Sequence, residues 1–417
     1  MDASVLYFLL AIFLCFMMTW GVGANDLANV MSTTMGSKAI TVRQALCIAV
    51  IFEFAGAFLG GTDVTETLRD GIIDVQLLAD DPLILIQGML AVLMACTIWM
   101  HLASFLGVPV SITNALVGSM VGFGWLVLGS EAVHWEQVSH IAIGWVTSPL
   151  IAGTTAFALF LSIQQTIFAK PDLLERSKRF IPIYLFLVGS VLSFITVFKG
   201  LSHFEIQLNL KQSLWVTLGT SIGITLLGMF VIHRIPEKPN LRRRERFLQV
   251  EKYFAVLMAM TACAMVFAHG ANDVALAVAP LSMVYSLITH VGEPLHATGY
   301  PAWIVLLGVV GVVIGFLVQG RRVIETVGSS ITALTPSRAF AATLSAATTV
   351  VIATSLGIPV SATQTLVGAV LGVGLARGIG ALNLIVIRNI FTSWILTLPA
   401  ASILTILSYK ALHAVLS

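Results

Sequence analysis

Residues 23–29 read GANDLAN, residues 270–276 read GANDVAL, and an apolar run of 16 residues precedes each copy. A carboxylate beside such a run costs a few kcal/mol to place in a bilayer, so its repetition indicates a role. A second pair of matching segments follows in the same order, with GVPVSITNALVGSMVGFG at 107–124 and GIPVSATQTLVGAVLGVG at 357–374. The offsets of 247 and 250 residues indicate two homologous halves.

The composition indicates an integral membrane protein. Of the 417 residues, 58% are hydrophobic and 10% are charged, far from the usage of soluble globular domains. The apolar runs approach the ~20 residues that a helix needs to cross a bilayer, whereas barrel strands would give alternating stretches of ~10 residues. The sequence therefore predicts an all-α polytopic membrane protein with about 12 transmembrane helices. The expected ranges are 5–22, 42–60, 82–105, 109–129, 139–163, 181–198, 213–233, 253–279, 301–319, 339–356, 358–376 and 383–407.

Loop charges predict the orientation. Segments 169–180 and 234–252 are rich in Lys and Arg, which places both on the cytoplasmic side. Counting crossings outward from them places the acidic segment 63–81 and both termini on the outer side. The RRRER run at 242–246 is interpreted as a topogenic loop, so no nucleic-acid partner is expected. We expect the protein to lie in the lipid bilayer of a bacterial inner membrane.

The repeat predicts the domain organisation. We expect a first repeat at 1–168 with five crossings, a connector at 169–252 with two helices and basic cytoplasmic loops, and a second repeat at 253–417 with five crossings. Five crossings in the first repeat and two in the connector place the start of the second repeat on the opposite side of the membrane from the start of the first. Inverted repeats with interrupted helices are frequent in secondary transporters, whose sites lie near the midplane between the halves. The alternative is a duplication kept only for packing.

The GAND motifs are candidate cation sites. Their carboxylate and amide oxygens are the hard ligands that a small cation needs. The glycines that flank each motif are expected to interrupt the helix and let the backbone line a cavity, at a depth that the spacing leaves open. The alternative is an Asn-Asp cap at an ordinary turn. The candidate residues are Asn25, Asp26, Asn272 and Asp273.

The paired PVS segments are candidate anion sites. Pro followed by Ser and Thr predicts a helix start, whose free N–H groups and hydroxyl donors suit an oxyanion. The alternative for the hydroxyl residues is a hydrogen bond to a carbonyl of their own helix. The alternative for the amide residues is a hydrogen bond that bridges two helices. The candidates are Ser111, Thr113 and Asn114 in one copy, and Ser361, Thr363 and Gln364 in the other.

The charges of these two sites predict that they act together. No repeated Lys or Arg lies near the motifs, so an anion beside Asp26 and Asp273 needs bound cations to neutralise the charge. This favours a cation–anion symporter. An intramembrane aspartyl enzyme using the same two carboxylates, or a passive anion channel, is the alternative. Glu53, inside a predicted helix, is either a coupling or gating carboxylate or one paired with a polar neighbour.

The doubled motifs, together with GSKAITVRQA at 36–45, FEFAGAF at 52–58 and ETVGSSITALTPSRAFAA at 325–342, resemble the inorganic phosphate transporter (PiT) family. The resemblance spans nearly the whole chain outside 164–252. It implies a cation-coupled phosphate symporter, commonly dimeric, with some relatives that carry sulfate. It also implies that the four Asn and Asp residues of the GAND motifs belong to the cation and phosphate centre and that the Ser and Thr residues contact phosphate.

The chain departs from the family pattern at Asn114 and Gln364, where His is frequent, and Asn29 of the first GAND segment has no counterpart in the second. We therefore expect unequal halves and sodium as the driving ion, bound at Asn25, Asp26, Asn272 and Asp273. Protons or a metal–phosphate complex are the alternatives. We expect no enzymatic activity, no cofactor besides the co-transported ion, and a homodimer.

Overall fold

The computed structural model describes residues 3–60, 71–74, 81–195, 197, 208–237, 242–289 and 301–416. Within these ranges the structure is helical apart from turns and one isolated bridge between Ile73 and Val133. A helix occupies each of the twelve expected ranges, which confirms the predicted fold class. Most of the acidic segment 63–81 lies outside the described residues.

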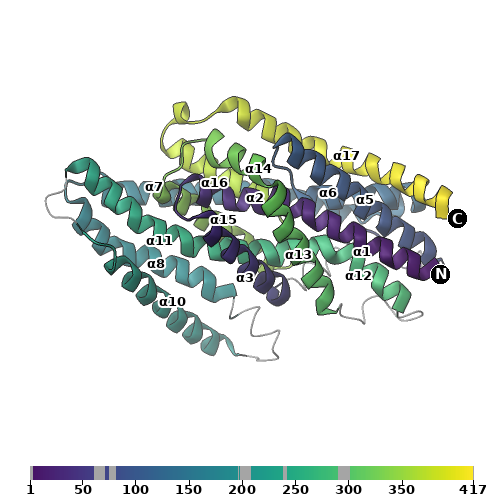
Figure 1. Ribbon diagram of the computed structural model, residues 1–417, viewed down its shortest axis with the longest axis horizontal. Coiled ribbons are helices and arrows are strands. Elements are labelled where there is room, and N and C mark those ends of the chain that lie inside the picture. Colours follow the sequence, from purple (N-terminus) through teal and green to yellow (C-terminus); the bar gives the residue numbers. More distant parts are fainter. Residues whose placement is uncertain are drawn as a thin grey trace.

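The first half runs from α1 to η4 (Figure 1). Its elements are α1 (Ala3–Val22), η1 (Gly23–Leu27), α2 (Ala28–Gly36), α3 (Val42–Gly60), α5 (Pro82–Leu106), α6 (Ile112–Leu128), η3 (Ser130–Ala132), α7 (Trp135–Ile163) and η4 (Gln164–Phe168). Two helices connect it to the second half, α8 (Leu173–Ile195) and α10 (Leu210–His233).

The second half repeats the order from α1 to α7, with α14 and η8 in addition. Its elements are α11 (Arg243–His269), η6 (Gly270–Val274), α12 (Ala275–Thr289), α13 (Ala302–Gln319), α14 (Arg321–Glu325), η8 (Thr326–Ser330), α15 (Pro336–Ser355), α16 (Ala362–Ala376), η9 (Ile379–Ala381) and α17 (Leu384–Leu416). In Figure 1, α1 and α11 enter from opposite ends of the molecule, as expected for inverted halves.

Both GAND motifs form a π-helical turn. The Ala28 N–H donates to the Gly23 carbonyl five residues back, so helix continues from Ser4 to Gly36. The second motif, in η6, joins α11 to α12 in one continuous helix from Arg243 to Thr289. The expectation that the flanking glycines open the backbone is therefore wrong. A π turn interrupts the α pattern while keeping backbone groups bonded, which the membrane interior requires and which often marks functional sites.

The backbone leaves the helical state at the paired PVS segments instead. Gly107 (φ 70°) ends α5 and Gly357 (φ 69°) precedes α16, both in the left-handed region that glycine adopts without strain. The chain then turns back, so that Cys96 of α5 lies 3.5 Å from Ser119 of α6, sulfur to oxygen. α5 and α6 therefore form a helical hairpin, and α15 packs against α16 after the equivalent turn of the second half.

The halves are interlocked. The short helix α6 of the first half packs along α17 of the second, and α16 of the second packs along α7 of the first. Glycines make the approach close, because a Cβ on Gly118 would lie 2.7 Å from the Leu398 carbonyl oxygen. The equivalent Gly368 packs in the same way against Pro149. Small residues of this kind let membrane helices approach backbone to backbone.

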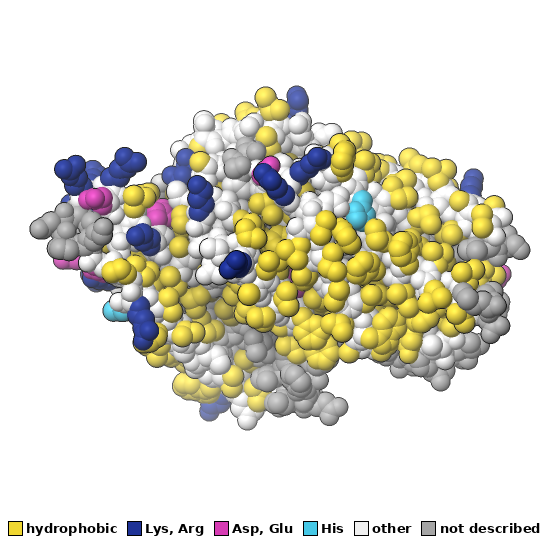
Figure 2. Space-filling model, viewed as in Figure 1, with side chains coloured by type: hydrophobic (Ala, Val, Ile, Leu, Met, Phe, Trp, Pro, Cys, Tyr) yellow, Lys and Arg dark blue, Asp and Glu magenta, His cyan; other side chains and the backbone are white. Residues whose placement is uncertain are grey.

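The surface is that of a membrane protein. Nine described helices are long and apolar enough to cross a bilayer, and α6 and α16 are shorter apolar helices. Figure 2 shows hydrophobic side chains over most of the visible face, with Lys and Arg gathered toward one end. Both termini lie at the opposite end in Figure 1.

Candidate ion and substrate site

The asparagines of the GAND motifs form hydrogen bonds with the turns that precede α6 and α16. Asn25 Nδ2 donates to the Val108 carbonyl at 3.0 Å, and the Val110 N–H donates to Asn25 Oδ1 at 2.9 Å. In the second half, Asn272 Nδ2 donates to the Val360 carbonyl at 2.7 Å. Each π turn is thus bonded to the start of the short helix of its own half. The cation and anion candidates therefore lie together.

Asp26 joins both halves. Its Oδ2 accepts from the Ile112 N–H at 3.2 Å, in the first turn of α6, and its Oδ1 accepts from the Thr363 hydroxyl at 2.7 Å, in the first turn of α16. Bonds to an ionised acceptor are stronger than neutral ones. A carboxylate therefore lies where the sequence predicts an oxyanion, at the starts of two helices.

Asp273 is bonded differently from its counterpart. Its Oδ1 accepts from Asn272 Nδ2 at 2.9 Å, whereas Oδ2 is buried without a hydrogen-bond partner. His269 Nε2 lies 3.4 Å from that Oδ2, close enough for an ion pair without hydrogen-bond geometry. Asn272 Oδ1 is also buried and unpartnered. The second GAND motif therefore offers two oxygens without a hydrogen-bond partner, whereas oxygens of Asn25 and Asp26 accept from protein donors.

The hydroxyl residues have two different roles. Ser111 and Ser361 cap α6 and α16, accepting from the N–H groups of Asn114 at 3.3 Å and Gln364 at 3.2 Å. Neither serine donates its own hydroxyl hydrogen to another described group, and a hydroxyl that accepts can still donate. Thr113 donates to the Val360 carbonyl at 3.1 Å, so its hydrogen is already engaged. The serines are thus the hydroxyls free to donate to an anion.

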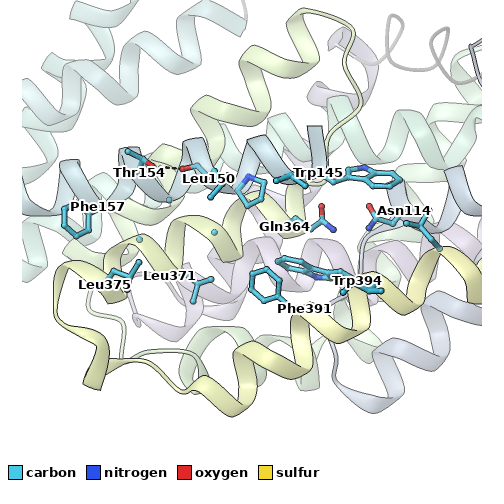
Figure 3. Close-up of a pocket in the computed structure, with 17 residues that line it drawn as sticks. Asn114, Trp145, Leu150, Thr154, Phe157, Gln364, Leu371, Leu375, Phe391 and Trp394 are labelled. Atoms are coloured by element: carbon cyan, nitrogen blue, oxygen red, sulfur yellow. Dashed lines mark hydrogen bonds between the residues drawn. The ribbon is translucent and has the colours of Figure 1, made fainter. Parts of the chain in front are cut away.

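The two amide side chains line a cavity of about 640 Å³ between α7, α16 and α17. Figure 3 shows Asn114 and Gln364 at one end of it, between the rings of Trp145 and Trp394. All ten residues predicted to bind ions or substrate are at most 3% exposed. An ion bound by these side chains would therefore be removed from bulk water.

Glu53 is paired with His269, a residue outside the predicted ion and substrate sites. Its Oε1 lies 2.5 Å from His269 Nδ1, and both side chains are fully buried. His269 directly precedes the second GAND motif, so it links α3 of the first half to the π turn that carries Asp273. Adjacency to a repeated motif was the available signal for this histidine. Its glutamate partner is 216 positions away, and no local pattern predicts it.

Asn29 is a second residue that was not selected as a ligand. It is fully buried, and neither its amide nitrogen nor its amide oxygen has a hydrogen-bond partner. It follows Asp26 by three positions on a continuous helix, which places the two side chains on one face. That spacing is a signal readable from the sequence.

The two halves interlock, and buried carboxylates lie where the starts of α6 and α16 meet. This arrangement is that of a membrane transporter. Residues 22–405 match the family model described as the Phosphate transporter family, so the chain belongs to that family. It is 44% identical over 403 residues to a candidate phosphate permease of Haemophilus influenzae, covering 96% of this chain and 95% of the relative. It is 39% identical to one of Pyrococcus abyssi, covering 98% of each.

A solved structure described as the sodium-dependent phosphate transporter is similar over the whole fold. The TM-score is 0.86 at 34% identity, covering 98% of this chain and 99% of the other. These comparisons confirm the expected family. The chain is a transporter and not an enzyme, so the aspartyl-enzyme alternative is wrong.

Proposed function

We propose that the protein is a sodium-coupled inorganic phosphate symporter working by alternating access, with the anion held between the starts of α6 and α16. The observation that carries this proposal is the bonding of Asp26 to donors of both helix starts. Family membership and the similarity to a sodium-dependent phosphate transporter support it.

Competition for these donors couples the two ions. The Ile112 N–H and the Thr363 hydroxyl donate to Asp26, although they are the groups that a bound oxyanion would use. A sodium ion on Asp26 draws the carboxylate oxygens toward itself and releases these donors to phosphate. Sodium then tightens phosphate binding, and by linkage phosphate tightens sodium binding to the same extent.

The cation ligands in this proposal are the oxygens of both GAND motifs: Asn25, Asp26, Asn272 and Asp273. Asn29 adds a further amide oxygen on the first half. Of the two GAND motifs, the second has the oxygens without a hydrogen-bond partner, on Asn272 and Asp273, so a sodium ion bound there displaces no protein hydrogen bond before phosphate enters. Bound sodium also reduces the repulsion between phosphate and two buried carboxylates in a medium of low dielectric.

The anion ligands in this proposal are the two helix starts and their side chains. Ser111 and Ser361 donate their free hydroxyl hydrogens, and Thr363 donates once sodium has taken Asp26. Asn114 and Gln364 complete the set, and Thr113 joins it by giving up its hydrogen bond to the Val360 carbonyl. Glu53 acts through His269 by fixing the π turn next to Asp273, which is a positioning role.

We also propose the organisation in which this site works. The repeats at 1–168 and 253–417 move against each other around the site, and 169–252 connects them. The basic end faces the cytoplasm, the termini face outward, the membrane is the bacterial inner membrane, and the assembly is a homodimer. Alternating access of this kind is common among transporters with inverted repeats.

Uptake of labelled phosphate into proteoliposomes tests the proposal. An inward sodium gradient at constant pH and ionic strength should drive accumulation, and replacing sodium by choline should abolish it. Accumulation driven by a proton gradient alone would favour the proton-coupled alternative. Uptake that requires a divalent metal would favour the metal–phosphate alternative, and uptake of sulfate instead of phosphate would identify a sulfate permease.

A further inference from the structure

Four buried polar atoms without partners gather at one end of the cavity between α7, α16 and α17. They are Asn114 Oδ1, Gln364 Oε1, and the indole nitrogens of Trp145 and Trp394. Asn114 and Gln364 are 2% and 3% exposed. Unpaired buried polar side-chain atoms are few in native proteins, and four beside one cavity indicate a ligand with matching groups.

These atoms divide into donors and acceptors. An indole N–H only donates, and a carboxamide oxygen only accepts. Figure 3 shows the two amides between the two indole rings, at the end of the cavity away from Phe157 and Leu375. A ligand that satisfies all four atoms must accept hydrogen bonds at some oxygens and donate them from others.

The amides also lie beside the proposed anion position. Asn114 and Gln364 each follow the capping serine of their helix by three positions, and their own N–H groups donate to those serines. Side chains at the cap and three positions later are neighbours at a helix start. An anion bonded to the Ser111 and Ser361 hydroxyls is therefore within reach of both carboxamides.

Resting on the proposed function, we propose that Asn114 and Gln364 accept hydrogen bonds from the P–OH groups of phosphate and so select it over sulfate. The indoles of Trp145 and Trp394 donate to the unprotonated oxygens. Dihydrogen phosphate carries two P–OH groups, one for each amide oxygen, and monohydrogen phosphate carries one, whereas sulfate carries none. Bound sulfate leaves both amide oxygens buried and unpaired, and sites built to bond a hydroxyl reject ligands that lack it.

Competition assays in proteoliposomes test this inference, with phosphate as the labelled substrate and sulfate or arsenate as competitors. Arsenate is tetrahedral and carries hydroxyls like phosphate, so it should compete with the wild-type protein where sulfate does not. Gln364→Met removes the acceptor at similar length. It should weaken phosphate binding and narrow the preference for phosphate over sulfate by at least about tenfold, the effect of one hydrogen bond to a charged ligand.

Two further variants separate selectivity from a structural role. Gln364→Asn keeps a carboxamide on a side chain one methylene shorter and should retain more of the preference than Gln364→Met. Trp394→Phe removes the N–H donor together with part of the ring and keeps both amide acceptors, so it should weaken binding of phosphate and sulfate alike and leave their ratio unchanged. Leu375→Val, at the other end of the cavity, serves as the matched control and should change neither quantity.

Failure of this inference is distinguishable from failure of the proposed function. Absence of wild-type phosphate uptake would refute the symporter itself. Wild-type uptake combined with an unchanged phosphate-to-sulfate ratio in Gln364→Met and in Asn114→Leu would refute only the selectivity assignment. A ratio that fell equally in Leu375→Val would also overturn it, because the effect would then come from altered packing.

Discussion

Replacing the glycine of the second GAND motif by alanine should destabilise the protein. Gly270 has ordinary helical angles (φ −56°, ψ −45°), so alanine adds no backbone strain there. Its Cβ would overlap the Glu53 carbonyl oxygen of α3 and lie 3.0 Å from the Ala57 nitrogen. Gly23 is confined in the same way by the Val312 carbonyl of α13. Each π turn therefore packs against a helix of the other half through a glycine.

The magnitude follows from comparison with an open glycine. Gly219 lies in α10, and a Cβ there meets no atom within 4 Å. Alanine gains up to about 1 kcal/mol of helix propensity over glycine in either helix, so this gain cancels between Gly219→Ala and Gly270→Ala. What remains is the overpacking cost, about 1–3 kcal/mol. Backbone atoms supply the overlap, and no side-chain rotation relieves it.

Unfolding of the purified variants in mixed micelles, titrated with sodium dodecyl sulfate, measures this difference. Gly219→Ala should equal or exceed the wild type in stability, and Gly270→Ala and Gly23→Ala should both fall below it. Equal stability of Gly270→Ala and Gly219→Ala would show that the π turn is not held against α3 as described.

Two further predictions concern the ions. Asp26→Asn and Asp273→Asn should each abolish sodium-driven phosphate uptake in proteoliposomes while the protein still elutes as a folded species, because the amide keeps the shape and loses the charge; sodium-dependent uptake in both would remove the cation assignment. Ser111→Ala and Ser361→Ala should each raise the phosphate KM about tenfold or more, the effect of one hydrogen bond to a charged ligand, and an unchanged KM in both would count against the anion assignment.

Much of the fold was predictable because hydropathy predicts the membrane helices and the repeated motifs predict two related halves. Every expected range carries a helix, and the GAND and PVS residues are as buried as their apolar surroundings require. The form of the interruption was not predictable. The glycines of the GAND segments predict an interrupted helix, but Gly23 lies within a continuous helix and admits the Val312 backbone. A close contact with a distant helix leaves no trace in the local sequence.

The inequality of the two carboxylates was only partly predictable. Thr113 and Thr363 occupy equivalent positions, yet Thr363 donates to Asp26 and Thr113 donates to the Val360 carbonyl. Residue type predicts only that a buried threonine hydroxyl donates a hydrogen bond to some acceptor. Which acceptor lies about 3 Å away is decided by packing between the halves. The Glu53–His269 bond belongs to the same class, because it joins residues from different halves.

The crossed pairing of short and long helices has a consequence for biosynthesis. Ser402 of α17 donates to the Gly118 carbonyl of α6 at 2.6 Å, so α6 acquires its partner only when the last helix of the chain has been made. Until then its glycine face meets lipid or a substitute neighbour. All residues of the first repeat are therefore synthesised before α6 can pack against its native partner. A ribosome that stops before α17 leaves a chain whose first half, already inserted, has never reached its native packing.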